Sequence, residues 1–244
     1  MLRLAKVLAA IILSTQIAAG CSRERETAAP VTRDVLLAIP RDPASLGAPV
    51  SLEALARHMA MSSTRPIREG DTLRAIKLAD EIRKSIAKYS DTAAAVADGY
   101  EHFENSSTEV HFNKYSVPVS TIDPEKPSAI LYQKTPEGMV LSGAMYNVAG
   151  SEADLEAITP LSLVRWHRHV NFCMPPAAEQ ERWTEKKSGQ LVFGNFGVSS
   201  EQDCRKAGGV FYRDLSGWMV HANVFSASTI GDIWGGTQMG SHLH

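Results

Sequence analysis

The chain has 244 residues, of which 44% are hydrophobic and 21% are charged, a composition ordinary for a soluble globular protein. Its 25 Lys and Arg residues nearly balance 27 Asp and Glu residues. The formal net charge of −2 argues against nucleic-acid binding through a basic surface, and the length allows one large domain or two small ones.

The N-terminus is typical of a secretory signal. Arg3 and Lys6 precede the apolar run VLAAIIL, which is too short to span a membrane as a helix. The next stretch, IAAGC, resembles the bacterial lipobox, with Ala18 where that motif usually has Leu. This resemblance implies that residues 1–20 are a signal peptide removed by cleavage and that Cys21 is acylated. The alternative is plain secretion without a lipid, to the periplasm or beyond.

The residues after the cysteine predict a membrane tether. Ser22 resembles the residue found in lipoproteins sorted to the outer membrane, so we expect an outer-membrane lipoprotein facing the periplasm. Residues 21–50 contain four prolines and no periodic apolar pattern, which predicts a flexible tether after the lipidated cysteine.

Residues 51–99 predict a helical region. Ser51 can cap a first helix over the stretch SLEALARHMAM, in which His58 is expected at the surface. Asp71 can cap a longer helix with an apolar stripe expected to face the core: Leu73, Ile76, Ile82, Ile86 and Tyr89. The stretch TAAAVAD predicts a short third helix that ends at Gly99.

Residues 100–244 predict a β-rich domain that holds the candidate metal site. The stretches AILYQ and MVLSGAMY flank KTPEG and predict a β-hairpin. Three more strands are predicted by LSLVRWHRHVNFC, GGVFYRD and GWMVHANVF, and residues 201–207 predict a short helix. The expected fold class is therefore α+β, with N-terminal helices followed by a mainly antiparallel sheet, small barrel or sandwich.

The pattern His-x-Asn occurs three times, although the chain has only six Asn residues. The three pairs are His111 with Asn113, His169 with Asn171, and His221 with Asn223. Because alternate residues of a strand point to the same face, Glu109 shares a face with His111, and His167 shares one with His169. Neighbouring strands of this kind would bring several imidazoles together.

Converging imidazoles predict a metal site, because neutral imidazole is the commonest protein ligand for zinc and copper. We predict that His167, His169 and His221, together with His111, bind one zinc or copper ion. The side chains expected to receive the outer N–H groups of these imidazoles are Asn113, Asn171 and Asn223. Glu109 is the candidate catalytic base if the protein is an enzyme.

Two other functions remain open at this point. The histidines and asparagines can instead form a metal-free polar network in an envelope binding or scaffolding module. A metal site of three imidazoles with an open fourth position would also suit a metal-dependent hydrolase or oxygenase.

Two cysteines remain besides Cys21, and they predict a disulfide. Cys173 and Cys204 would pair in an oxidising compartment and close a loop of about 30 residues. The alternative makes Cys173 a metal ligand, because it has the strand parity of His167 and His169.

The order and spacing of these motifs between Asp98 and Trp234 resemble a group of uncharacterised bacterial exported proteins. The motifs that carry the resemblance are HFN, WHRHVNFC and GWMVHAN. The group has no assigned activity, so the resemblance implies an envelope location and no particular reaction. The expected partners are the membrane, through the lipid, and a metal ion, with no nucleic acid.

Overall fold

The computed structural model describes residues 56–102, 109–114, 118–194, 197–215 and 217–235. The predicted signal peptide, Cys21 and the tether lie outside these residues. The described helices and strands are β1 (Met59–Met61), α3 (Asp71–Ile86), η2 (Ala87–Ser90), α4 (Thr92–Ala97), β2 (Glu101–His102), β3 (Glu109–Asn113), β4 (Ala129–Thr135), β5 (Gly138–Val148), α5 (Glu152–Ile158), β6 (His167–Met174), η3 (Gln180–Thr184), β7 (Lys186–Lys187), β8 (Gln190–Leu191), α6 (Glu201–Lys206), β9 (Val210–Asp214), β10 (Trp218–Ala222) and α7 (Ile230–Gly235).

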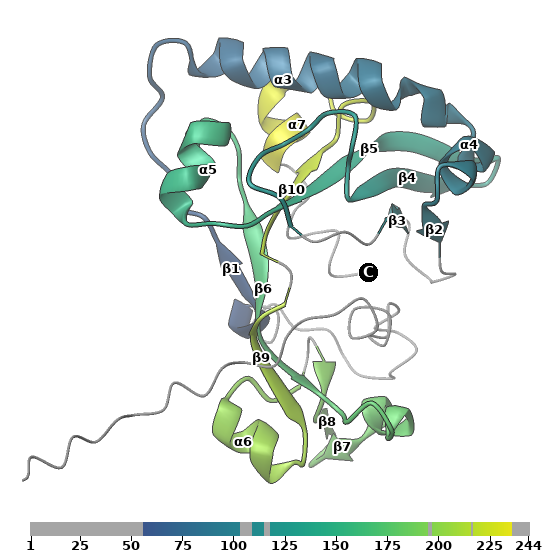
Figure 1. Cartoon of the computed structure of the whole chain (residues 1–244), viewed down its shortest axis with the longest axis vertical. Helices are drawn as coiled ribbons and strands as arrows, with labels where there is room; N and C mark the ends of the chain where they lie inside the picture. Colours follow the sequence, from purple (N-terminus) through teal and green to yellow (C-terminus); the bar gives the residue numbers. More distant parts are fainter. Residues whose placement is uncertain (1–55, 103–108, 115–117, 195–196, 216, 236–244) are drawn as a thin grey trace, which may run out of the picture.

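The fold is α+β, as predicted, and its centre is one antiparallel sheet with helices on one face (Figure 1). The sheet has eight strands in the order β1-β6-β10-β5-β4-β3-β2, with β9 also paired to β6. It remains open rather than closing into a barrel, since β1 and β2 are its two ends. Within the described ranges, every helix is too short or too polar to cross a membrane.

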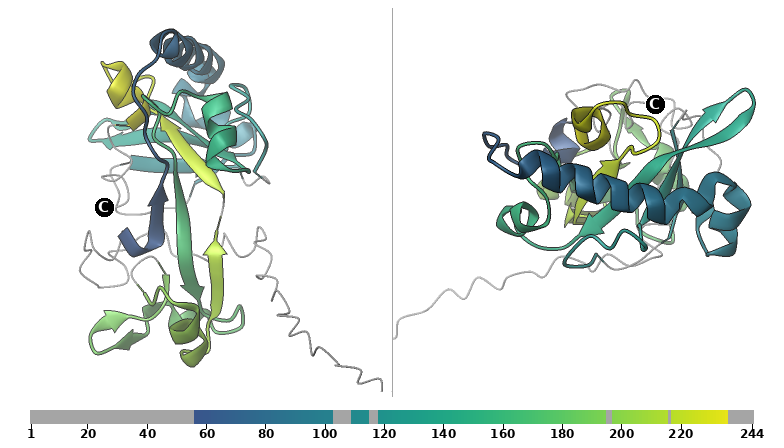
Figure 2. Two further views of the ribbon diagram at one scale, coloured as in Figure 1. Left: turned by 90° about the vertical axis from the view of Figure 1, so that its left-hand side faces the viewer. Right: turned by 90° about the horizontal axis from the view of Figure 1, so that it is seen from above.

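Helix α3 lies across the sheet and forms the main core with it (Figures 1 and 2). The helix buries one stripe, made by Ala75, Ala79, Ile82 and Ile86. The sequence prediction was right for the C-terminal part of this stripe and wrong for Leu73 and Ile76, which are 71% and 42% exposed. The core side of this part of the helix carries Ala75 and Ala79 instead.

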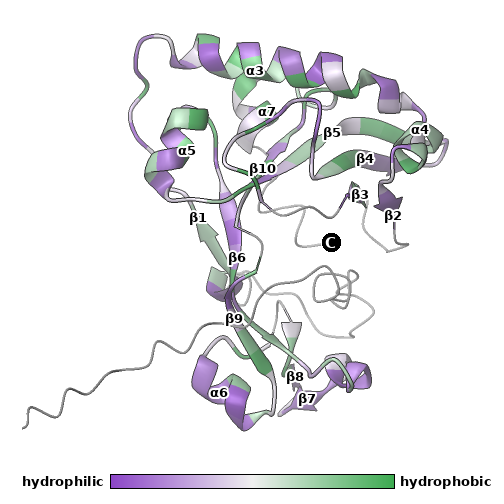
Figure 3. Ribbon diagram, in the orientation of Figure 1, coloured by the Kyte–Doolittle hydropathy of each residue, from purple (hydrophilic) through white to green (hydrophobic). Residues whose placement is uncertain are grey.

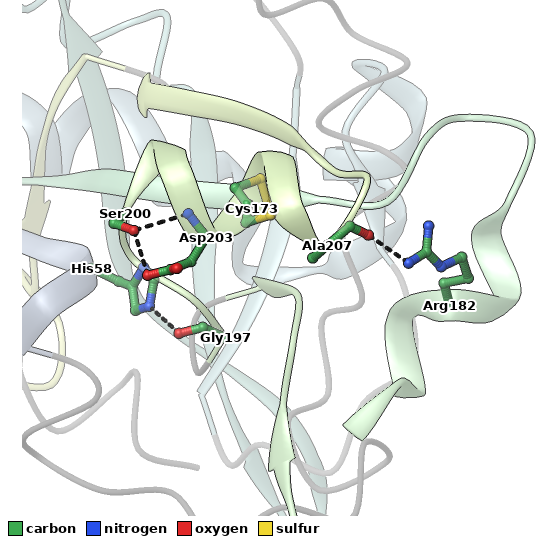
Figure 4. The surroundings of a disulfide bond; sticks show 8 residues. His58, Cys173, Arg182, Gly197, Ser200, Asp203 and Ala207 are labelled. Carbon is green, nitrogen blue, oxygen red and sulfur yellow. Dashed lines mark hydrogen bonds between the residues drawn. A yellow bond between two sulfur atoms is a disulfide. The ribbon is translucent and has the colours of Figure 1, made fainter. Parts of the chain in front are cut away.

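The first predicted helix is wrong at its C-terminal end. Met59–Met61 form strand β1 and pair with His167–His169 of β6. Backbone pairing with a distant strand overrides a local helical pattern, because strand formation depends on its neighbours more than on propensity. His58, predicted at the surface, is fully buried, and its Nε2 donates a hydrogen bond of 3.2 Å to the Gly197 carbonyl (Figure 4).

Most of the other predicted elements are confirmed. The hairpin is β4 and β5, the short third helix is α4, and residues 201–206 form α6. The Asp91 carboxylate caps α4 by accepting a hydrogen bond from the Ala93 N–H. The longest predicted strand is shorter than expected, since only His167–Met174 form β6.

Strand β6 connects the main sheet to a smaller core at the other end of the molecule (Figures 1 and 2). Strands β10 and β9 pair with successive parts of β6, β10 at His167 and β9 from Val170 to Met174. The predicted disulfide is present: Cys173 on β6 is bonded to Cys204 on α6 (Figure 4). Both cysteines are buried in this smaller core, among Phe172, Trp183, Phe193 and Tyr212.

Candidate metal centre

The histidines lie on the face of the sheet that α3 does not cover. Directly paired residues of neighbouring strands point to the same face. His111 on β3 pairs with Leu131 on β4, His221 on β10 pairs with Met145 on β5, and Met219 pairs with His167 on β6. Leu131 pairs in turn with Gly143, two residues before Met145, so all these side chains share one face. The opposite face carries the residues that pack against α3, among them Phe112, Ile130, Tyr132 and Tyr146.

This face is strongly concave. Strands β3 and β10 are separated by β4 and β5, so in a flat sheet they would lie about 14 Å apart. The ring centroids of His111 and His221 are nevertheless only 5.2 Å apart. The sheet must therefore curl with the histidines on its inner side. Gly143 on β5 allows a close approach of the neighbouring strand β10, because a Cβ at that position would lie 2.1 Å from the Ala222 carbonyl oxygen where β10 ends.

Three donors meet at the centre of this concave face. One carboxylate oxygen of Glu109, Oε1, lies 3.2 Å from Nε2 of His111 and 3.6 Å from Nδ1 of His221. Atoms bound to one zinc ion at about 2.1 Å and at angles near 90–110° lie roughly 3.0–3.4 Å apart. The three side chains each offer a ligand atom within 4.8 Å of the others, so this group could hold a metal ion.

The charge of Glu109 is consistent with a cation at this position. Glu109 is only 7% exposed. Its ion-pair partners are the imidazoles of His111 and His221; among the described residues, no lysine or arginine nitrogen lies within 4.0 Å of its carboxylate. An ionised carboxylate taken out of water is costly unless a positive charge or a set of hydrogen bonds compensates it. A metal ion bound among the three donors would supply that charge.

Two further imidazoles, those of His167 and His169, lie beside this group on β6. The first residues of β6 are hydrophilic (Figure 3). The ring of His167 lies 5.5 Å from that of His221, and the ring of His169 lies 6.0 Å from that of His167. His167 and His221 are fully buried. Burial, with the nearby imidazoles of His167, His58 and His111, lowers the pKa of His169 to about 3. His169 is therefore neutral near pH 7, which is the form that binds metals.

The structure separates the predicted ligands into two groups. It brings His111 and His221 together with Glu109, and it places His167 and His169 beside this group rather than within it. Cys173 is bonded to Cys204, so the disulfide replaces the alternative role of Cys173 as a ligand.

The three asparagines take different positions. Asn113 donates a hydrogen bond of 3.1 Å to the carbonyl oxygen of His111, on its own strand. Asn171 donates one of 3.1 Å to the Arg57 carbonyl and has a φ of 59°, a left-handed conformation that asparagine tolerates better than most residues. Asn223 is buried just after β10, and its backbone N–H bonds the Ile233 carbonyl.

Sequence reasoning gave Glu109 only as a candidate base, and the structure adds that it could also be a metal ligand. The signal was present, because Glu109 and His111 form a Glu-x-His pair on one strand and alternate residues share a face. Two imidazoles and one carboxylate form a donor set that holds zinc in enzymes and leaves a coordination position for water. The same two-His, one-carboxylate set also suits non-haem iron.

Comparisons of this chain with family models, with curated proteins and with solved structures found no match.

Proposed function

We propose that this chain is a lipid-anchored protein of the bacterial envelope that binds one transition-metal ion through Glu109, His111 and His221. The observation that carries the proposal is the convergence of two imidazole nitrogens, from strands three positions apart in the sheet, on one buried carboxylate oxygen. Glu109 and His221 are buried on this face, and the side chain of His111 is 26% exposed.

The donor set narrows the choice of metal. Zinc binds imidazole nitrogen and carboxylate oxygen at about 2.0–2.2 Å and accepts three protein ligands with water in the fourth position. Copper(II) also binds imidazole and carboxylate, and more tightly by the general order of affinities. We propose zinc as the resident ion and copper as its competitor.

The location is proposed from the N-terminal motif and from the disulfide. The sequence IAAGC would place a lipid on Cys21. The Cys173–Cys204 bond supports an oxidising compartment such as the periplasm, because disulfides are rare in proteins of the cytosol. Metabolic labelling with a palmitate analogue tests the anchor: the wild-type chain incorporates the label and the Cys21→Ser variant does not.

Metal binding is tested by competition with a chromophoric zinc chelator on untagged protein. The background variant His242→Ala/His244→Ala removes the terminal imidazoles, which could bind metal on their own. We expect one zinc ion per chain in this background, and Glu109→Gln to weaken binding by about 100-fold or more, since even residues that only orient ligands contribute 10–100-fold.

The matched control is Glu137→Gln, which neutralises an exposed carboxylate in the turn between β4 and β5. This variant should bind zinc as the background does. Absence of stoichiometric metal, with an unchanged melting temperature on adding zinc, would support instead a metal-free binding or scaffolding module.

A catalytic role is the second candidate, and it is favoured by the number of protein donors. Three ligands leave a coordination position at which zinc would lower the pKa of a bound water, or iron would bind oxygen. Hydrolysis of a panel of activated esters and phosphoesters, and oxygen consumption with iron(II), test the hydrolase and oxygenase forms. Turnover must disappear in Glu109→Gln for this candidate to stand.

A further inference from the structure

Methionines stand directly beside the histidines of the concave face. Met59 of β1 pairs with His169, and Met61 of β1 pairs with His167. On the other edge of β6, Met219 of β10 also pairs with His167. Directly paired residues of antiparallel strands have Cβ atoms about 4.5–5.5 Å apart and point to the same face. His167 therefore has a thioether side chain on each side.

Core packing alone does not require methionines to pair with histidines as regularly as they do here. The chain has eight methionines, and four of them pair directly with a histidine on this one face: Met59, Met61, Met145 and Met219. Met145 and Met219 also pack with Ala129 and Leu131 in a small apolar cluster. Met59 is only 7% exposed, yet it belongs to none of the apolar clusters of the described residues.

We propose that His167 and His169, with the thioethers of Met59, Met61 and Met219, form a second metal position that binds copper(I). Thioether sulfur is a soft ligand that selects copper(I), whereas carboxylate favours harder divalent ions. The two imidazoles have ring centroids 6.0 Å apart, and two imidazoles that share one metal ion have centroids about 5–6 Å apart.

The two positions use different residues. The position proposed for zinc uses Glu109, His111 and His221, and the copper(I) position uses none of these. Glu109 and His111 lie on β3, whereas Met59 and Met61 lie on β1 at the other end of the sheet. Strand β10 carries one donor of each set, His221 and Met219. The inference therefore stands or fails independently of zinc binding, and the two outcomes can be measured separately.

The test is an anaerobic titration of untagged full-length protein with copper(I), held by a chromophoric copper(I) chelator, in the His242→Ala/His244→Ala background. Silver(I) serves as a second probe, because it binds the same donors and is not oxidised. We expect one copper(I) per chain, and at least tenfold weaker binding in Met59→Leu/Met219→Leu. Leucine keeps the size and apolarity of the side chain and removes only the sulfur.

Met174→Leu is the matched control, because Met174 lies on the same strand β6 but is buried in the smaller core near the disulfide. It should bind copper(I) as the background does. Glu109→Gln should lose zinc and keep copper(I), whereas Met59→Leu/Met219→Leu should keep zinc. X-ray absorption at the copper edge should show a sulfur shell at about 2.3 Å, the length of a metal–sulfur bond.

The proposal is overturned if the background fails to compete for copper(I), or if Met59→Leu/Met219→Leu binds it as tightly. Circular dichroism of each variant establishes that it is folded. If the double variant unfolds, the single variants Met59→Leu and Met61→Leu and the absorption spectrum of the background protein decide the question. A copper shell of nitrogen alone contradicts the thioether ligands.

Discussion

Gly143 lies against the backbone that directly follows the proposed ligand His221. A methyl group at this position would lie 2.1 Å from the Ala222 carbonyl oxygen and 2.9 Å from the Asn223 Cα, both of which are backbone atoms that cannot move alone. His221 is next to Ala222, so any backbone shift that relieves the clash also moves a proposed ligand. A glycine in the interior of a strand often marks such a close backbone approach.

We therefore predict that Gly143→Ala lowers the free energy of unfolding by about 1–3 kcal/mol, the usual cost of overpacking. It should also weaken zinc binding at least tenfold. The control is Gly231→Ala on α7, where the nearest atom to the added Cβ is the Thr229 hydroxyl at 3.9 Å. Urea denaturation and zinc competition on both variants check this. Equal zinc affinity in Gly143→Ala and wild type would show that the close approach does not position His221.

At the scale of elements, the N-terminus of α3 is held by a partly buried ionic network rather than by the side-chain cap predicted for Asp71. Arg65 donates to Asp71 at 2.6 and 2.9 Å and also binds both carboxylate oxygens of Glu156 on α5. The Ser162 hydroxyl and the Arg68 N–H donate to the same Asp71 carboxylate. The network ties α3 and α5 to the segment that follows β1.

This network predicts an acid-sensitive stability. Hydrogen bonds from the Arg65 guanidinium hold the pKa of Asp71 well below its usual range. The folded state then binds the proton more weakly than the unfolded chain, so the stabilisation is complete above about pH 5 and is lost as the pH falls through the lowered pKa. In Asp71→Asn this dependence should largely vanish.

The measurement is the free energy of unfolding of both proteins between pH 7 and pH 2.5. The wild type should be the more stable at pH 7, and the difference should shrink steadily below pH 5. A difference that stays constant down to pH 2.5 would mean that Asp71 contributes by packing or neutral hydrogen bonds alone. Asp232→Asn, which changes an exposed carboxylate on α7, is the control.

At the scale of the whole molecule, β6 carries the second group of histidines at one end and the disulfide at the other. The smaller core around the disulfide contains few apolar residues, so it depends on the covalent bond between Cys173 and Cys204, which are 31 residues apart. Gly209 packs against both sulfurs, and a Cβ there would lie 2.6 Å from the Cys173 Sγ.

We predict that Cys173→Ala/Cys204→Ala lowers the free energy of unfolding by about 3.5–4 kcal/mol, the value expected for a disulfide that closes a loop of this length. Zinc affinity should change less than threefold, because Glu109, His111 and His221 lie on strands of the main sheet. Urea denaturation and zinc competition check both parts. A large loss of zinc binding would show that the smaller core positions the main sheet.

Much of the local structure was predictable because the sequence patterns of these short segments agree with the secondary structure that the segments form in the fold. The β4–β5 hairpin has a turn sequence between two apolar runs, and Asp91 has the chemistry of a helix cap. Strand parity correctly placed Glu109 with His111 on one face of β3 and Met219 with His221 on one face of β10, and both pairs lie on the same face of the sheet. These pairs need only the two-residue period of a strand.

The composition of the site was not predictable, because it depends on strand order and curvature. Nothing in the sequence near His221 indicates that β3 comes to face β10 across two other strands. For the same reason the sequence indicated Glu109 only as a candidate base, whereas the structure places it where it could also bind a metal ion. Strand β1 was missed for a related reason, since Met59–Met61 become a strand only by pairing with β6, more than a hundred residues away.

The most direct test of the central claim is a crystal structure of the zinc-loaded protein with anomalous data collected on both sides of the zinc absorption edge. We predict one anomalous peak about 2.1 Å from the Glu109 carboxylate, from Nε2 of His111 and from Nδ1 of His221. A fully folded structure with no peak at this position, or with zinc bound only elsewhere, would contradict it.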